Sequence, residues 1–160
     1  MQTPINVRLM LGNDTVNARL GQVIQSMEEK VGFNVTLDPT EFTTLLNKAD
    51  AGSFEAVAFG WSGRVDPDGN TYGFVATPGT TNDAGYSSNK LDYILNSARK
   101  SVTEKSRTTL YSAAMKIIHR DRPLIYLWHP VNYYGVSKSV TGVQVFGDGL
   151  IRAQYAAYAK

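Results

Sequence analysis

The chain has 160 residues, of which 42% are hydrophobic and 19% charged, the size and composition of one globular domain rather than of a disordered chain. Its 16 basic and 14 acidic residues nearly balance and are scattered, which argues against a nucleic-acid-binding surface. The absence of cysteine excludes disulfide bonds and thiolate metal sites, and no apolar run approaches the ~20 residues of a membrane-spanning helix.

The first half of the chain alternates between the periods of strands and helices. Residues 5–9 and 33–37 alternate apolar with polar side chains, whereas the region between them has apolar side chains three and four apart. That helical face, which we expect to point into the core, consists of Val16, Leu20, Val23, Ile24, Met27 and Val31. Either Asn13 or Asp14 is its predicted N-cap, and Gly32 its end.

The pattern predicts strands near residues 5–10, 33–37 and 54–60 and helices near residues 14–31 and 41–51. The third strand is a continuous apolar run, which is typical of burial on both faces. Strands that alternate with helices predict a parallel arrangement with right-handed crossovers within an α/β fold.

Residues 60–88 are rich in Gly, Pro, Asn, Asp, Ser and Thr and are predicted to be a long loop, a length typical of functional segments. Tyr72, Phe74 and Tyr86 are predicted to anchor it. Helices are then expected from Ser88 or Asn89 and from Ser101 or Thr103, followed by a buried strand at 124–128. Weaker strands are predicted at 133–136 and 143–146, and the last ten residues as strand or frayed helix. We expect a single domain over residues 1–160.

The stretch Phe59 to Gly69 reads FGWSGRVDPDG and is the strongest functional signal. A buried strand that ends in a loop with Trp61, Arg64 and Asp66 is a typical small-molecule site, because the ring supplies an apolar wall and the charges orient a ligand. The alternative is an ordinary strand exit, with Trp61 in the core and residues 66–69 as a turn.

Catalytic motifs are absent from the sequence. There is no phosphate-binding loop, no dinucleotide-binding glycine pattern and no nucleophile elbow. His119 and His129 are interpreted as structural, and Asp66 and Asp68 are too few for a calcium loop. We therefore predict no catalytic residue, no metal and no cofactor.

Several separated segments resemble one protein family, the substrate-binding proteins of ABC importers in the peptide and nickel class, known as extracellular solute-binding protein family 5. The resemblance rests on segments along the whole chain, in the family's order and spacing. These are Gly32-Phe33-Asn34-Val35, residues 54–61 with Asp66-Pro67-Asp68, Asn82 with residues 85–88 and Asp92, Arg107 with Leu110-Tyr111 and Ala114, and residues 121–127.

The resemblance implies one lobe of a type II periplasmic-binding-protein fold, with a mixed sheet flanked by helices. Family members have two lobes and are several-fold longer, so residues 1–160 are expected to be an excised C-terminal lobe. The implied function is non-catalytic capture of a peptide or other small polar solute. The implied partners are the N-terminal lobe and the membrane permease subunits. The implied location is periplasmic or extracellular, with a lipoprotein anchor outside this chain as one option.

The resemblance and the loop chemistry together nominate Trp61, Ser62, Gly63, Arg64 and Asp66 as ligand contacts. One residue departs from the family. Peptide-binding relatives have an acidic residue three positions after the tryptophan, which meets the ligand's amino group, and here that position is Arg64. A guanidinium favours a carboxylate or phosphate and repels an ammonium. Asp66 taking that role after a local shift, and Arg64 facing solvent, are the alternatives.

Two other functions stay open from the sequence. One is an enzyme of unknown class that uses Asp66, Asp68 and His129. The other is a sensory or interaction module built on the same lobe.

Overall fold

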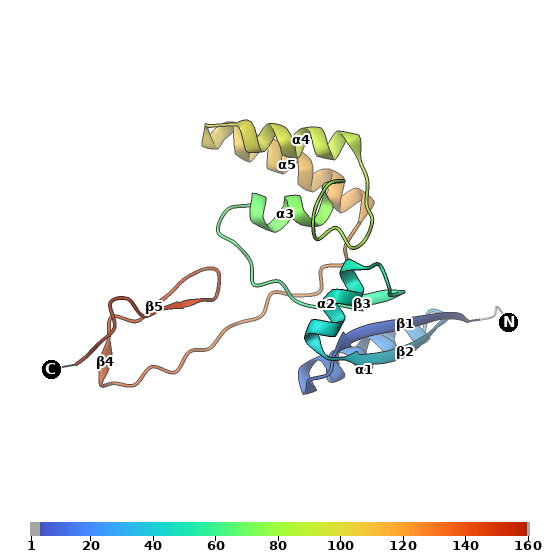
Figure 1. Cartoon of the computed structure of the whole chain (residues 1–160), viewed down its shortest axis with the longest axis horizontal. Helices are drawn as coiled ribbons and strands as arrows, with labels where there is room; N and C mark the ends of the chain where they lie inside the picture. The colour runs from blue at the N-terminus through green and yellow to red at the C-terminus, as the bar shows by residue number, and fades with distance from the viewer. Residues whose placement is uncertain (1–3, 160) are drawn as a thin grey trace. The chain divides into compact units, whose positions relative to one another are not determined.

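The computed structural model describes residues 4–159 and divides into two compact units, Met1–Trp61 and Ser62–Lys160, which we describe separately (Figure 1). The first unit contains β1 (Ile5–Gly12), α1 (Thr15–Glu29), β2 (Phe33–Thr40), α2 (Phe42–Asp50) and β3 (Ala56–Ala58). These are the strands and helices predicted there, with β3 shorter than expected. None of the helices in the described part of the chain is long and apolar enough to cross a membrane.

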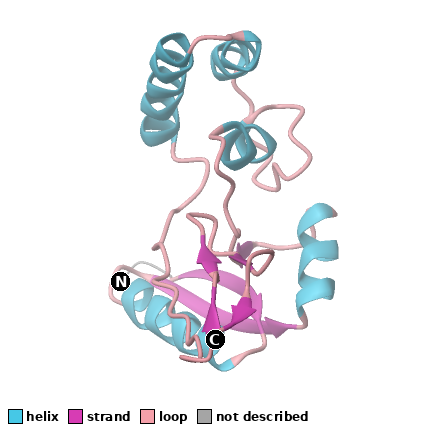
Figure 2. Ribbon diagram, turned by 90° about the vertical axis from the view of Figure 1, so that its left-hand side faces the viewer, coloured by secondary structure: helices cyan, strands magenta, loops and turns pink. Residues whose placement is uncertain are grey.

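The first unit is a parallel sheet in the order β2-β1-β3, with one crossover helix per connection. Figure 2 shows a helix on each side of this sheet. Leu9 and Leu11 of β1 form a core with Val35 of β2, whereas Leu45 of α2 is buried separately and α2 packs on β1. Because side chains alternate along a strand, Met10, which is also buried, points to the face opposite Leu9 and Leu11.

Helix α1 begins as predicted, since Asp14 accepts the N–H groups of Val16 and Asn17, and it ends at Glu29, shortly before Gly32, which has a positive φ. The prediction of its buried face is wrong, however, because four of the six residues predicted to point into the core are exposed. The exposed residues are Val16, Val23, Met27 and Val31. Gly21 is the buried position, and a Cβ there would lie only 3.1–3.2 Å from the methyl groups of Leu37 and Leu11. The helix therefore packs on the sheet through Gly21. With Gly21 facing the sheet, most of the apolar side chains point towards solvent.

Strand β3 is half-buried and lies at one edge of the three-stranded sheet, so the prediction of burial on both faces is wrong for this chain. Its apolar run has one neighbouring strand, β1, among the residues that the structure describes. An apolar run does not by itself tell a central strand from an edge strand.

The second unit is built on three helices: α3 (Asp68–Val75), α4 (Asn89–Lys100) and α5 (Glu104–Asp121). Helices α4 and α5 pack against each other (Figure 1). Ser88 and Thr103 cap them, as predicted. Leu91, Leu95 and Ala98 of α4 are fully buried, and they form one core with the buried residues Ala114, Ile117 and Ile118 of α5.

The prediction that residues 60–88 form a loop is wrong for α3. Its sequence, DGNTYGFV, has two glycines and lacks a 3.6-residue apolar period, so propensity disfavours a helix. Tertiary contacts override that preference, since Val75 is fully buried in the helical core and Tyr72 and Phe74 pack against it. Together with Tyr86, these aromatic residues anchor the segment as expected.

The predicted buried strand at 124–128 is also wrong. Residues 123–136 form no helix or strand, and Ile125 is 86% exposed. Two small antiparallel ribbons follow: β4 (Val140–Thr141) with β7 (Ala157–Tyr158), and β5 (Gln144–Val145) with β6 (Ile151–Arg152). They confirm strand structure near 143–146 and in the last ten residues, but not at 133–136.

Candidate functional site

The strand order places a natural binding position in the first unit. The connection from β1 leads to β2 on one side, and the connection from β2 leads to β3 on the other side of β1. The connections that leave β1 and β2 therefore cross the sheet in opposite directions, and open α/β sheets bind ligands beyond the carboxyl ends of their strands where the strand order reverses in this way. Trp61 comes three residues after β3, and its side chain is 47% exposed. It is therefore not the buried core residue of the alternative interpretation.

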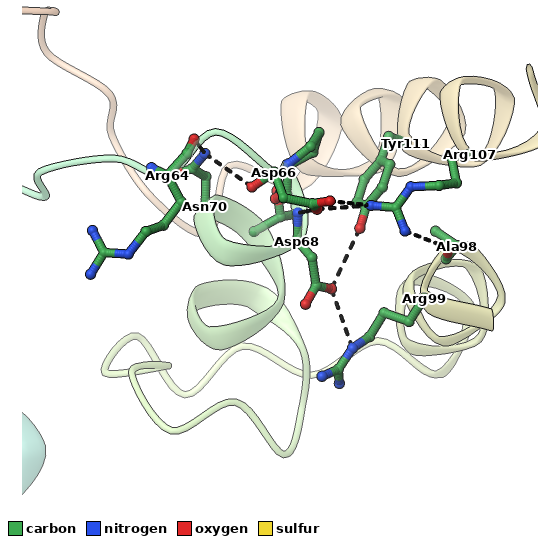
Figure 3. Close-up of polar contacts among 10 residues, drawn as sticks. Arg64, Asp66, Asp68, Asn70, Ala98, Arg99, Arg107 and Tyr111 are labelled. Atoms are coloured by element: carbon green, nitrogen blue, oxygen red, sulfur yellow. Dashed lines mark hydrogen bonds and ion pairs between the residues drawn. The ribbon is translucent and has the colours of Figure 1, made fainter. Parts of the chain in front are cut away.

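Ser62, Gly63 and Arg64 begin the second unit and contact one another. The Arg64 guanidinium donates from Nη1 to the Ser62 hydroxyl oxygen at 2.9 Å and to the Gly63 carbonyl oxygen at 2.6 Å. Gly63 has a φ of 75°, a conformation that favours glycine. The structure thus brings three predicted site residues into one local cluster. The Arg64 side chain extends away from Asp66 and α5 (Figure 3).

Asp66 contacts a different partner. Nη2 of Arg107, on α5, donates to both Asp66 carboxylate oxygens at 2.8 Å, and Nη1 donates to the Ala98 carbonyl oxygen at the end of α4 (Figure 3). Asp66 also accepts the backbone N–H of Asp68 at 2.8 Å. Its charge is therefore balanced inside the second unit, which argues against the alternative that Asp66 replaces the family's acidic residue as a receptor for an amino group.

Asp68 is also bound by helices α4 and α5. Arg99 Nε lies 3.3 Å from its Oδ1, and the Tyr111 hydroxyl donates to the same oxygen at 3.4 Å. Burial, together with the charge of Asp68, raises the pKa of the Tyr111 hydroxyl, which therefore stays protonated and can donate. The Arg99 guanidinium lies 4.1 Å from the centre of the Tyr72 ring. These contacts tie the first turn of α3 to the two long helices.

Two hollows flank this ion-pair cluster within the second unit. The larger, of about 900 Å³, is lined by side chains that include Asp66, Pro67, Arg107 and Tyr111, and the smaller, of about 250 Å³, by Asp66, Asp68, Gly69, Arg99 and Arg107. His129 lines neither hollow, so neither of them brings together the three residues of the enzyme alternative. Among residues 4–159, no group of three or more His, Asp or Glu side chains is placed to hold a metal ion.

The motif of Asn82, Tyr86 and Asp92 shapes the chain between α3 and α4. The Asn82 amide donates to the Tyr86 carbonyl oxygen at 2.7 Å and accepts the Tyr86 N–H at 3.1 Å. The Asp92 carboxylate accepts the Thr77 N–H at 2.8 Å, and Ser88 caps α4. These residues support the architecture, since their polar groups are used within the chain.

Sequence reasoning missed the residues that hold the loop in place, Gly69, Asn70 and Arg107. The family resemblance includes Arg107 but implies no role for it, and the turn of the alternative interpretation includes Gly69. The signal that could have found Asn70 is an amide side chain soon after a glycine-containing loop, because asparagine pairs readily with the backbone of nearby residues.

Comparison with known proteins gives relatives of one kind. No protein-family model matches the chain. The di/tripeptide-binding protein 2 of Pseudomonas aeruginosa is 28% identical over 149 residues, which are 89% of this chain and 28% of that protein. The periplasmic oligopeptide-binding protein OppA of Escherichia coli is 25% identical over 81% of this chain and 24% of its own length. The chain is a relative of bacterial peptide-binding proteins. The resemblance drawn from the sequence is therefore confirmed.

Solved structures agree on the fold. A dipeptide-binding protein from Pseudoalteromonas sp. SM9913, in complex with Met-Leu, aligns with 99% of this chain at a TM-score of 0.82 and 21% identity. The periplasmic binding protein DppA of Helicobacter pylori, in complex with the peptide STSA, aligns with 76% of the chain at a TM-score of 0.66 and 26% identity. The α/β fold of a periplasmic binding protein is confirmed. The chain spans 33% and 25% of these two structures, and 28% and 24% of the two relatives.

Proposed function

We propose that this chain is part of a longer, two-lobed binding protein that captures a peptide or another small polar solute for an ABC importer without chemical conversion. The observation that carries the proposal is the sequence similarity, over 81–89% of the chain, to proteins named for binding di-, tri- and oligopeptides. The ion pairs of Asp66 and Asp68 support the non-catalytic role, since these carboxylates have structural partners.

In this proposal, residues 1–160 are the C-terminal lobe, and the partner lobe is encoded elsewhere in the same polypeptide. The ligand is captured by closure of the two lobes, and the closed form meets membrane permease subunits. The protein works in the periplasm or outside the cell, with a lipid anchor outside this chain as one arrangement. The relatives are three to four times as long as the part of them that this chain covers, and this greater length supports the two-lobed assignment.

Trp61, Ser62, Gly63 and Arg64 are the proposed ligand contacts, with Asp66 positioning the loop. The exposed indole of Trp61, at the sheet's carboxyl edge, supports an apolar wall for the ligand. Arg64 supports an anionic group on the ligand at that position rather than the ammonium group that an acidic residue would receive.

The test is ligand capture by the full-length protein. Native mass spectrometry of the purified protein should show a bound small molecule or peptide, and calorimetry should show that Trp61→Ala weakens its binding. Tyr93→Ala, which removes an exposed ring on α4, is the matched control and should leave binding unchanged. Chemical conversion of the ligand, or equal affinity in the Trp61→Ala protein, would overturn the proposal.

A further inference from the structure

Arg64 is held by its backbone to the first turn of α3. The Asn70 side chain accepts the Arg64 N–H at 2.7 Å through Oδ1 and donates to the Arg64 carbonyl oxygen at 2.6 Å through Nδ2 (Figure 3). A primary amide is suited to this, because it presents a donor and an acceptor side by side. Nδ2 also lies 3.4 Å from the Asp66 carbonyl oxygen. One side chain thus fixes both peptide groups that flank the Arg64 α-carbon.

The Cβ and Cγ atoms of Arg64, the root of its side chain, pack on Gly69. A Cβ at Gly69 would lie 2.8 Å from Arg64 Cγ and 2.9 Å from Arg64 Cβ, closer than nonbonded carbon atoms approach. These atoms are next to the backbone, so a change at the flexible end of the arginine would not relieve the overlap. Glycine is otherwise less favourable than alanine within a helix. Its position in α3 is explained by the space that Arg64 needs.

The tip of the same side chain is directed by Ser62 and Gly63, whose oxygen atoms accept from Nη1. Backbone, root and tip are therefore each restrained, although Arg64 and Asn70 are exposed. We propose that Gly69 and Asn70 are positioning residues that set the direction of the Arg64 side chain. We call Gly69 and Asn70 the Arg64 seat.

The consequence for the ligand rests on the proposed function. A guanidinium whose direction is fixed before binding loses less conformational freedom when it pairs with a planar carboxylate. The Arg64 seat therefore determines specificity for an anionic ligand group through Arg64, without contact between Gly69 or Asn70 and the ligand.

The first test needs no ligand. In NMR spectra of the 160-residue chain, three-bond couplings should report one Arg64 χ1 rotamer, and Gly69→Ala should change them. Asn70→Ala should speed exchange of the Arg64 amide hydrogen about fivefold, the effect of losing one ordinary hydrogen bond. Asn70→Asp keeps an acceptor but loses the donor, so its effect on exchange should be smaller.

Two matched substitutions serve as controls. Gly147→Ala adds a methyl group where no heavy atom lies within 4 Å, and Asn89→Ala removes an exposed amide from the first residue of α4. Neither should alter the Arg64 signals. Unchanged Arg64 couplings in Gly69→Ala together with unchanged exchange in Asn70→Ala would overturn the Arg64 seat, whatever the protein binds.

The second test is a double-mutant cycle in the full-length protein, with the dipeptide Met-Leu and its C-terminal amide as probes. Gly69→Ala should weaken binding of the free carboxylate when Arg64 is present and have no effect in an Arg64→Ala background. An equal loss in both backgrounds would show a general structural role and would overturn the specificity role. If the wild-type protein binds neither probe, Met-Leu is not its ligand, and the NMR result alone decides on the Arg64 seat.

Discussion

Arg64 and Asp66 lie two residues apart and contact different partners. Asp66 is bound by Arg107 and contributes to the shape of the loop, whereas Arg64 contacts the polar groups of Ser62 and Gly63. A partly exposed ion pair such as Asp66–Arg107 typically adds little to stability, so its importance is the position it gives to the loop. The charge offered to a ligand by this segment is therefore expected to be positive.

The charge at position 64 should control affinity in the full-length protein. Arg64→Ala removes charge-assisted hydrogen bonds and should weaken binding of an anionic ligand about 10- to 150-fold. Arg64→Asp should weaken it further, because repulsion is added to the loss. Calorimetry with the co-purified ligand measures both effects, and equal affinities in all three proteins would show that Arg64 faces solvent.

Asp121 should make the stability of the chain depend on pH. Hydrogen bonds from Arg120, and then from the Tyr86 hydroxyl, lower the pKa of Asp121 from 3.8 to about 2. Since the folded-state pKa is depressed, the stabilisation is present above about pH 4 and is lost as the pH falls towards 2. Chemical denaturation should therefore show a difference between wild type and Asp121→Asn at pH 6 that shrinks at pH 2.

Tyr86→Phe is the companion variant to Asp121→Asn, because it removes only the hydroxyl that donates to Asp121 at 2.6 Å. Its effect should follow the same pH profile with a smaller amplitude. A difference that stays constant between pH 6 and pH 2 in both variants would contradict the assignment.

At the scale of elements, helix α5 depends on its N-cap. The Thr103 hydroxyl accepts the Ser106 N–H, and Thr103→Ala should lower the free energy of unfolding by about 1 kcal/mol. Thr109→Ala is the control within the helix, where alanine is the better helix former, and should be neutral or slightly stabilising. Thermal unfolding followed by circular dichroism measures both, and equal destabilisation would show that the threonine methyl groups, not the cap, matter.

The elements that could be predicted from the sequence are those whose boundaries are set by residues at their own ends. Ser88, Thr103 and Gly32 mark boundaries through local hydrogen bonds or a positive φ, so their helices could be predicted closely. Helix α3 could not be predicted, because its stability comes from burial of Val75 against distant helices rather than from propensity. The exposure of the apolar side chains of α1 could not be predicted for a similar reason, since the contact of Gly21 with the sheet sets the rotation of the helix.

The candidate site was only partly predictable. A tryptophan at the end of an apolar strand indicates a binding position, because strand ends and aromatic walls have local sequence signals. That Asp66 pairs with Arg107, 41 residues away, depends on how α5 packs, and no local pattern reports it. The roles of Gly69 and Asn70 likewise depend on the packing of Arg64 against the first turn of α3, which no local pattern reports.

At the scale of the whole molecule, this chain alone should bind solutes weakly. In the proposed function the second lobe supplies the remaining contacts and the closure that excludes water, and both are missing from these 160 residues. Calorimetry should therefore give no submicromolar affinity for the chain by itself, against tight binding of the same ligand by the full-length protein. Submicromolar binding by the isolated chain would contradict the two-lobed assignment.

The irregular stretch of residues 124–136 has a consequence for handling the protein. Proteases need an extended substrate backbone, and this stretch is free of helix and strand and presents Tyr126, Leu127 and Trp128 at 50–64% exposure. A brief chymotrypsin digest should cut there first, while the helical core up to Asp121 resists. Mass spectrometry of the fragments would locate the cut. Early cleavage within α4 or α5 instead would mean that the helices open more readily than this segment.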